Sequence, residues 1–500
     1  MVPASGVAPG TMSHESKDFH DDPGRERAVT RYVSTRGQAP ALGFCDAMLT
    51  GLARDGGLYV PEVWPRLTRE EIAALFGRPY WEVAVEILRR FVGDEISHAD
   101  LSRMANEAYA TFRHPAVVPL TQTGVSQFVL ELFHGPTLAF KDVAMQLLSR
   151  LIDHVLGQRG ERTTIVVATS GDTGGAAVDA FAGRDHVDLV VLFPHGRISE
   201  VQRRMMTTTG AANVQALAVE GTFDDCQALV KAMFNHHAFR DEVSLSGVNS
   251  INWARIVAQV VYYFTSAVAL GAPERTVDFT VPTGNFGDIF AGYVAKKMGL
   301  PIGRLRIATN VNDILARTLK TGIYEVRGVH ATASPSMDIQ VSSNFERLLF
   351  EATGRDAAHV RALMASLDQS GRFVLPDAVL AAIRADFEAG SAGEEEMQAA
   401  IRAAWREAGE LVDPHTAVAL AVADRDIVDH TVPSVVLSTA HAAKFPDAVE
   451  EACGMRPQLP AWLDGLMEKP ETMSVVTNDR NEIERIVRAA SRVARQGAAE

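Results

Sequence analysis

Cysteine is scarce in this chain. Three cysteines occur among 500 residues, at positions 45, 226 and 453, and no two of them form a C-x-x-C pair. Disulfide-stapled folds and structural zinc sites both need closely spaced cysteines, so neither class is favoured and no metal site is predicted. Unpaired cysteines are typical of a reducing compartment, and we expect a cytoplasmic protein.

Membrane spans, export signals and basic tracts are also missing. The longest apolar-rich helix pattern, residues 251–270, contains Asn252, Arg255 and Gln259 and is too polar for a bilayer. Residues 1–28 are rich in Pro, Gly, Ser and charge, lack an apolar stretch, and are predicted to be a disordered tail. Because the net charge is −14, neither nucleic acid nor a membrane is an expected partner.

Apolar residues are abundant, at 47% of the chain, which is enough for two or three domains. Short β-branched runs alternate with helix patterns, as in parallel sheets covered on both faces. A first series has predicted strands 163–169, 187–193 and 213–219, separated by predicted helices 174–182, 199–208 and 223–236. A second series has strands 277–281, 304–310 and 434–439, and the Ala-rich residues 355–411 are predicted to be helical. The pattern predicts an α/β fold of two open αβα units with a ligand cleft between them.

A lysine stands at a predicted strand-to-helix junction. The segment HGPTLAFKD, residues 134–142, follows the apolar run 128–133 and precedes a helix pattern. Lys141 is therefore expected among apolar neighbours, where loss of hydration lowers the pKa of an amine and lets it form a Schiff base with an aldehyde. On spacing alone, a helix-start lysine with its amine in solvent is the commoner explanation.

Two glycine-rich loops each follow a predicted strand and open a predicted helix. The first, PTGNFGD, leaves N–H groups free to converge on one phosphate, and its spacing is neither a Walker nor a dinucleotide motif. Its candidate cofactor-binding residues are Gly284, Asn285, Phe286, Gly287 and Asp288. The second, SGDTGG, can hold a carboxylate, with Ser170 and Thr173 as candidate substrate contacts. Ordinary glycine turns, the second capped by Asp172, explain either loop taken by itself.

Three further side chains are candidates for binding an anionic substrate. Asn252 and Arg255, three residues apart in NSINWAR, share one helical face and can bind a phosphate together. The alternative is that Asn249 or Ser250 caps this helix and Arg255 pairs with an acid. Lys444, in AHAAKF, is a weaker candidate because lysines commonly stay at the surface.

Taken in order, these motifs resemble those of the threonine synthases. The resemblance is carried by YVSTRG (32–37), LTGLARDGGLYVPE (49–62), HGPTLAFKD (134–142), ATSGDTGGAA (168–177), NSINWAR (249–255), PTGNFGD (282–288), SPSMDIQVSSNFERLLFE (334–351), DPHTAVAL (413–420) and STAHAAKFPDAV (438–449). These segments cover nearly everything after residue 30, and the block 334–351 is not shared by the dehydratases and cysteine synthases of the same fold. The chain is similar to the longer form of the family found in many bacteria and fungi.

The resemblance implies a cofactor and a division of the chain. Threonine synthases are pyridoxal 5'-phosphate (PLP) enzymes of the tryptophan-synthase-β-like fold, also called fold type II. Lys141 would hold the cofactor, loop 284–288 would bind its phosphate, and Thr439 would meet its pyridine nitrogen, which makes the cofactor a milder electron sink. The implied parts are a tail (1–28), an N-terminal subdomain (29–118), a large PLP-binding domain (119–159 and 247–450), a small mobile domain (160–246) and a C-terminal helical extension (451–500).

The resemblance also implies an activity. It is a PLP-dependent carbon–oxygen lyase reaction on a phosphate ester, in threonine biosynthesis: O-phospho-L-homoserine and water give L-threonine and phosphate, by γ-elimination and β-addition of water, with Lys141 as the base. The alternatives are a related ammonia-lyase acting on O-phosphohomoserine or on a hydroxyamino acid, and a non-catalytic PLP-binding relative. The expected partner is the small-molecule substrate, and the sequence leaves monomer and homodimer open.

Overall fold

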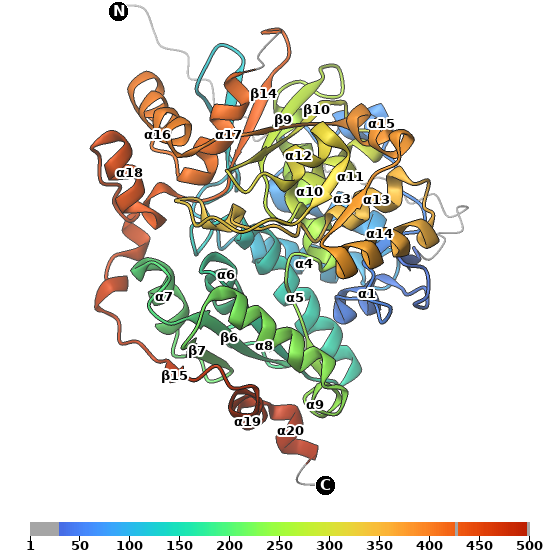
Figure 1. Ribbon diagram of the computed structural model, residues 1–500, viewed down its shortest axis with the longest axis vertical. Helices are drawn as coiled ribbons and strands as arrows, with labels where there is room; N and C mark the ends of the chain where they lie inside the picture. The colour runs from blue at the N-terminus through green and yellow to red at the C-terminus, as the bar shows by residue number, and fades with distance from the viewer. Residues whose placement is uncertain (1–29, 426–428, 498–500) are drawn as a thin grey trace, which may run out of the picture.

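The computed structural model describes residues 30–425 and 429–497 of the chain. Within them the chain forms two mostly parallel sheets, one above the other in Figure 1, each with helices on both faces. The predicted class of two open αβα units is therefore confirmed. The predicted tail, residues 1–28, lies outside the described residues.

The large sheet has six strands in the order β13-β10-β9-β14-β4-β3. They are β3 (Leu120–Gln122), β4 (Gln127–Glu131), β9 (Val277–Pro282), β10 (Ile302–Thr309), β13 (Phe387–Ser391) and β14 (Ser434–Ser438). Neighbours pair in parallel except β3 and β4. Val435 and Leu437 of β14 share a core with α10 (Trp253–Ala269) and α11 (Gly287–Lys297), whereas Val436 shares one with α17 (Pro414–Asp424). Successive side chains thus enter cores on opposite faces, which explains why these strands are apolar throughout.

The small sheet has five parallel strands in the order β15-β7-β6-β5-β8. They are β5 (Thr163–Ala168), β6 (Val187–Pro194), β7 (Val214–Val219), β8 (Leu245–Ser246) and β15 (Ser474–Val476), with helices α6 (Asp172–Phe181), α7 (Glu200–Thr207), α8 (Phe223–Asn235) and α9 (His237–Glu242). Ile165 and Val167 belong to the core shared with α5 (Lys141–Arg159) and α6, while Val166 belongs to the core under α8. Helix α5 also packs against α10, so it joins the two units.

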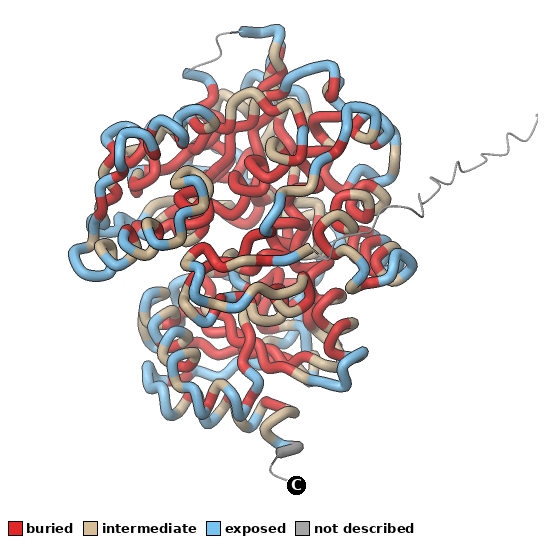
Figure 2. Tube along the Cα trace, turned by 90° about the vertical axis from the view of Figure 1, so that its right-hand side faces the viewer, coloured by how far each residue is buried: buried red, intermediate tan, exposed pale blue. Residues whose placement is uncertain are grey.

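Residues 30–118 form a smaller layer beside the large sheet. Strands β1 (Tyr32–Ser34) and β2 (Tyr59–Pro61) pair antiparallel, and the helices are α1 (Phe44–Thr50), α2 (Arg69–Ala73), α3 (Tyr80–Val92) and α4 (His98–Tyr109). Helix α3 packs on α10, and α4 packs on α5. Figure 2 shows that the buried parts of the chain run through the centre of the molecule, with exposed turns around them. No helix in the described ranges combines the length and apolarity that a membrane crossing needs.

The segment 355–411, predicted to be helical, also contains two strands. It holds α14 (Ala357–Ser370), α15 (Asp377–Asp386), α16 (Glu394–Ala403) and a π-helical turn (Ala404–Ala408), but β12 (Arg372–Val374) pairs with β11 (Ile323–Glu325), and β13 forms an edge of the large sheet. The sequence of β13, FEAGS, has no β-branched residue; its pairing with β10 defines it. The prediction of helix is confirmed for α14, α15 and α16, and it is wrong for β12 and β13, where sheet pairing overrides a weak local preference.

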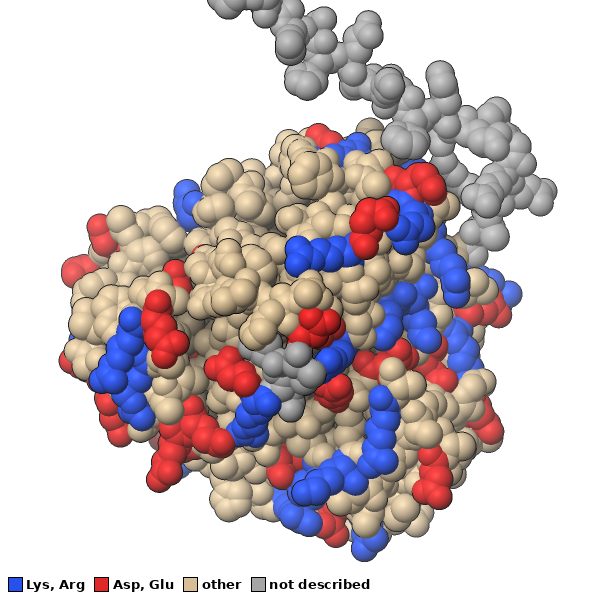
Figure 3. All heavy atoms as spheres, turned by 90° about the horizontal axis from the view of Figure 1, so that it is seen from above, with Lys and Arg blue, Asp and Glu red and all other residues tan. Residues whose placement is uncertain are grey.

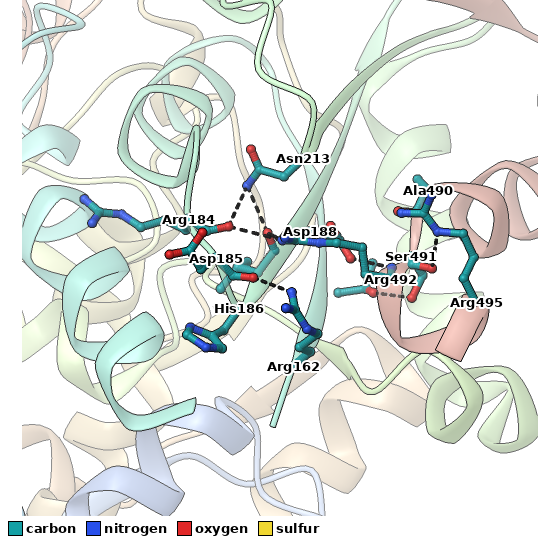
Figure 4. Close-up of polar contacts among 12 residues, drawn as sticks. Arg162, Arg184, Asp185, His186, Asp188, Asn213, Ala490, Ser491, Arg492 and Arg495 are labelled. Atoms are coloured by element: carbon teal, nitrogen blue, oxygen red, sulfur yellow. Dashed lines mark hydrogen bonds and ion pairs between the residues drawn. The ribbon is translucent and has the colours of Figure 1, made fainter. Parts of the chain in front are cut away.

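The C-terminal extension, predicted to be helical, contributes a strand as well. Beyond α18 (Pro446–Cys453) the chain runs past α7, adds β15 to the small sheet, and ends in α19 (Arg480–Ala490) and α20 (Arg492–Gly497) (Figure 1). Arg492 Nε donates to Asp188 Oδ1 at 2.7 Å, and its Nη2 donates to the carbonyl of Val187 at 2.8 Å (Figure 4). This end of the chain is therefore part of the small unit.

Candidate active site

Lys141 is the first residue of α5 and follows the loop after β4. The backbone N–H of Phe140 donates to the carbonyl of Thr439 at 2.8 Å, which holds this loop against the end of β14. Lys141 is 8% exposed and lines a cavity of ≈ 590 Å³. Burial lowers the pKa of its amine, although Asp172 acts in the opposite direction. An amine in this environment loses its proton more readily than one in water.

The cavity lies where the carboxyl ends of strands from both sheets meet. It receives the loop after β5, the loop after β9 and the end of β14. Of the predicted site residues, the structure brings these to its wall: Lys141, Ser170, Thr173, Arg255, Gly284, Asn285, Phe286, Gly287, Asp288 and Thr439. Asn252 and Lys444 are not brought there.

The loop after β9 is fixed by hydrogen bonds from two side chains to its backbone carbonyl groups. Ser342 Oγ donates to the carbonyl of Gly284 at 2.6 Å, and Asn344 Nδ2 donates to the carbonyl of Asn285 at 2.9 Å. No hydrogen bond among the described residues uses the N–H groups of Gly284, Asn285 or Phe286. Phe286 has a φ of 63°, the left-handed conformation, directly before α11. These N–H groups at a helix start fit a phosphate group.

Gly284 has no room for a side chain. A Cβ at this position would lie 2.4 Å from the carbonyl oxygen of Ser336. Ser336 belongs to a short 3-10 turn, Pro335–Met337, within the block 334–351. The turn Pro335–Met337 therefore packs closely against the loop after β9, whose N–H groups face the cavity.

Asp288, at the start of α11, is bound by two tyrosines of α10. Its Oδ1 accepts hydrogen bonds from the hydroxyls of Tyr262 and Tyr263, whereas Oδ2 has no partner within the described residues. Burial raises the pKa of Asp288 to about 6, which these two hydrogen bonds only partly offset. The carboxyl group therefore takes up a proton far more easily than a surface aspartate.

The loop after β5 is stabilised by Thr169. Its Oγ1 accepts from the backbone N–H groups of Gly171 and Gly174, each at 2.9 Å. Gly171, with a φ of 137°, is the N-cap of α6, and it has no side chain to cap with. The alternative in which Asp172 caps this helix is therefore not found. Ser170 and Thr173 face the cavity on either side of the helix start.

Asp172 forms ion pairs with two lysines. Its Oδ1 lies 2.7 Å from Lys444 Nζ, and its Oδ2 lies 3.4 Å from Lys141 Nζ. Lys444, predicted as a substrate contact, is fully buried beside Asp172 and away from the cavity wall. The sequence pattern missed Asp172 as the counterion of Lys141, because the two residues lie in different loops.

The predicted anion-binding pair on α10 is divided by the structure. Asn252 is the N-cap of α10: its Oδ1 accepts from Ala254 N–H at 3.0 Å, and its Nδ2 donates to the carbonyl of Met48 at 2.8 Å. Neither Asn249 nor Ser250 is this cap. The amide of Asn252 is thus occupied by backbone, which explains why it does not reach the cavity.

Arg255 does line the cavity, and it has no counterion among the described acidic residues. It is 3% exposed, and its Nη1 donates to the carbonyl of Val248 at 3.2 Å. Within residues 30–425 and 429–497 it forms no ion pair, and its Nε has no hydrogen-bond partner. Burial lowers the pKa of Arg255 to about 10. The alternative in which Arg255 pairs with an acid is not found, and a buried, unpaired guanidinium fits an anionic ligand.

His415 also lines the cavity, and sequence reasoning missed it. Its Nδ1 lies 2.6 Å from Asp413 Oδ2, and its Nε2 accepts from the backbone N–H of Ser336 at 3.1 Å. Asp413 is the N-cap of α17, followed by Pro414. A sequence signal was present for the helix start, because an Asp-Pro pair before an apolar run is typical of an N-cap followed by the first helical position.

A buried lysine of lowered pKa and a loop whose N–H groups are free among the described residues, both in one cavity, are typical of pyridoxal-phosphate enzymes. Comparison with known proteins gives the same class. Residues 119–437 match the family model of pyridoxal-phosphate dependent enzymes, and residues 31–109 and 416–487 match the threonine synthase N-terminal and C-terminal models. A threonine synthase from Pseudomonas aeruginosa is 51% identical, over 91% of this chain and 98% of its own length.

Solved structures give the same result. The PLP-bound threonine synthase from Brucella melitensis is 63% identical, with a TM-score of 0.91, and covers 93% of this chain and 100% of that one. Threonine synthase from yeast is 39% identical, with a TM-score of 0.87, over 92% and 99% of the two chains. The chain belongs to the threonine synthase family, whose cofactor is PLP.

Proposed function

We propose that this chain is a threonine synthase that converts O-phospho-L-homoserine and water to L-threonine and phosphate. As such it is a PLP-dependent carbon–oxygen lyase acting on a phosphate ester. The observation that carries the proposal is the position of Lys141: a buried amine of lowered pKa, in one cavity with a loop whose N–H groups are unused.

The lining of the cavity supports a set of proposed cofactor contacts. Lys141 would tether the cofactor aldehyde, loop 284–288 would bind its phosphate, and the hydroxyl of Thr439 would meet the pyridine nitrogen. A bound PLP withdraws electrons from the substrate Cα and so makes its proton acidic. A hydroxyl at the nitrogen leaves that nitrogen uncharged more readily than a carboxylate would, so the cofactor withdraws electrons less strongly. Removal of the Cα proton then depends more on the base, Lys141.

The substrate contacts involve fewer residues than the sequence predicted. Ser170 and Thr173, beside the start of α6, would bind the substrate carboxylate, and Arg255 would bind an anionic group such as the substrate phosphate; their positions on the cavity wall support both roles. The neutral amine of Lys141 takes the proton from Cα. A second proton leaves Cβ as phosphate departs from Cγ. Protons then return to Cγ, which becomes the methyl group, and to Cα, and water adds its hydroxyl at Cβ, so the net reaction consumes one water and releases phosphate.

Movement of the small unit is part of the proposal. Ser170 and Thr173 belong to the small unit, in the loop after β5 and the first turn of α6, whereas Lys141 and Arg255 belong to the large-sheet unit. A rotation of residues 160–246 toward the large domain would bring the carboxylate-binding loop onto the substrate and exclude water until it is needed.

The surface and the cysteines support a cytoplasmic enzyme with a small-molecule substrate. Cys45, Cys226 and Cys453 are all free thiols. On the face shown in Figure 3, basic and acidic side chains are interspersed and no extended patch of one sign is present. A binding surface for nucleic acid would need a basic patch. Monomer and homodimer are both compatible with the proposal.

Product analysis tests this function. Purified protein is incubated with O-phospho-L-homoserine, and phosphate, threonine, 2-oxobutyrate and ammonia are measured. Equal amounts of threonine and phosphate are expected; 2-oxobutyrate and ammonia in place of threonine would assign the chain to the ammonia-lyases instead. Lys141→Ala is expected to lose both turnover and the visible absorbance of the bound cofactor, whereas Lys297→Ala, on the outer end of α11, keeps both.

A further inference from the structure

Lys444 is a buried lysine that the proposed reaction does not use. It lies in the 3-10 turn Ala442–Lys444 that follows β14, and it is 0% exposed. Its Nζ lies 2.7 Å from Asp172 Oδ1 and donates to the carbonyl of Thr137 at 2.8 Å. Burying an ammonium group is costly, and a buried ion pair seldom adds stability over an apolar alternative. Stability is therefore a poor explanation for this pair.

The carboxylate of Asp172 is shared unequally between two lysines. Oδ1 is paired closely with Lys444 and also accepts from Gln202 Nε2 at 2.9 Å, whereas Oδ2 is 3.4 Å from Lys141 Nζ. Burial would raise the pKa of Asp172, but Lys444 and then Lys141 hold it well below its ordinary range. Asp172 is thus ionised at neutral pH, with most of its contacts directed away from Lys141.

Charged groups reach Lys141 from four elements. Asp172 on α6 favours a proton on Lys141, whereas Lys444 after β14 and Arg255 on α10 oppose it. Asp288 on α11 is a further titratable neighbour. Without Lys444, the full charge of Asp172 would act on Lys141 and would hold a proton there.

We propose that Lys444 is a positioning residue that neutralises Asp172, so that Lys141 can stand as a free amine and accept the proton of the substrate Cα. The proposal rests on the proposed function, in which Lys141 is both tether and base. Lys444 touches neither substrate nor cofactor; it acts through Asp172. A proton that leaves Cα then goes to an amine whose nearest carboxylate is already paired.

Titration of the holoenzyme tests this assignment. Lys444→Met removes the charge at similar volume, and the visible absorbance of the Lys141-bound cofactor is followed against pH. The apparent pKa is expected to rise by about 1 to 3 pH units, because Asp172 then faces Lys141 alone. Lys444→Arg is expected to keep the wild-type titration. Asp172→Asn is expected to lower the apparent pKa, and it remains decisive if Lys444→Met fails to fold.

The matched control is Lys296→Met, which removes another lysine–aspartate pair, with Asp386 at 3.0 Å, outside the cavity. It should leave the titration unchanged. An unchanged titration in Lys444→Met, or an unchanged or raised pKa in Asp172→Asn, overturns the proposal. A visible band that survives in Lys141→Ala would instead overturn the proposed function itself. Steady-state kinetics add a second readout: kcat of Lys444→Met falls at neutral pH and recovers at higher pH, while KM changes little.

Discussion

The imidazole of His415 accepts a hydrogen bond from the backbone N–H of Ser336, with 3.1 Å between nitrogen atoms. Because the ring accepts at Nε2, its proton is assigned to Nδ1, which lies 2.6 Å from Asp413. The turn that contains Ser336 presses on Gly284. His415 therefore ties the start of α17 to the loop that would bind the cofactor phosphate.

Replacement of His415 tests this connection. In His415→Leu the N–H of Ser336 and the carboxylate of Asp413 both lose a buried partner, at a cost of about 1 to 3 kcal/mol. We expect PLP affinity to fall about tenfold, measured by fluorescence titration, with a smaller loss for His415→Gln. His195→Leu, at an exposed position, is the control and should bind PLP as the wild type does. Equal affinity in His415→Leu would contradict this connection.

A methyl group at Gly284 should displace the phosphate-binding loop. The added Cβ would meet the backbone oxygen of Ser336 at 2.4 Å, and backbone cannot rotate away as a side chain can. Gly284→Ala is expected to weaken PLP binding about tenfold or more, about 1.4 kcal/mol, in a fluorescence titration. Gly328→Ala is the matched control, since its Cβ would meet nothing within 4 Å. Similar affinities for the two variants would argue against the close contact.

Asp288 should make stability depend on pH in the acid range. Burial raises its pKa to about 6, above the value of about 4 expected in the unfolded chain. Below pH 4 the carboxyl group is protonated in both states. Between about pH 4 and pH 6 the folded protein keeps a proton that the unfolded chain releases, so this group's contribution to stability falls as pH rises, by about 2 to 3 kcal/mol in total.

Asp288→Asn removes this dependence while it keeps acceptors for both tyrosine hydroxyls. In urea unfolding of the cofactor-free protein, the variant should gain on the wild type as pH rises from 4 to 7. Asp313→Asn, which changes a half-exposed carboxylate, gives the background dependence. A constant difference between Asp288→Asn and wild type across this range would show that the carboxyl group titrates normally.

Arg492 should be needed for the stability of the small unit. Its backbone N–H and Nε both donate to Asp188, whose side chain is 3% exposed. Arg492→Ala leaves this buried carboxylate with one of those bonds, at a cost of about 1 to 3 kcal/mol in chemical unfolding. Arg495→Ala, which loses contacts only to carbonyls of Ala490 and Ser491, should cost less than about 0.5 kcal/mol. Equal losses would rule out a specific contribution of Arg492.

The sequence predicted those parts of the fold that local pattern specifies. β5, β6 and β9 are long, β-branched runs followed by glycine turns, and they lie where the pattern put them. β13 and β15 were missed because one has no β-branched residue and the other has only three residues. These strands form because they pair with the exposed edges of β10 and β7. Their own sequences do not reveal that pairing, which depends on the folded chain.

The same limit applies to the site. Lys141 and the two glycine loops were predicted because each is a short motif at a strand end. The contacts between segments were not: Lys444 with Asp172, His415 with Ser336, and Tyr262 with Asp288 each join residues that are distant in the chain or unremarkable in pattern. Asn252 was misread because helix capping and anion binding use the same residue types.

Strand β14 lies between β9 and β4 in the large sheet, although it is the last of these strands in the chain. During synthesis β4 and β9 are complete long before the strand that must separate them exists. The small sheet is completed even later, because its edge strand β15 begins at residue 474. While residues 283–433 are being made, a nascent chain of this protein therefore has open edges on β4, β9 and β7, which makes shielding from other unfinished chains a condition of its assembly.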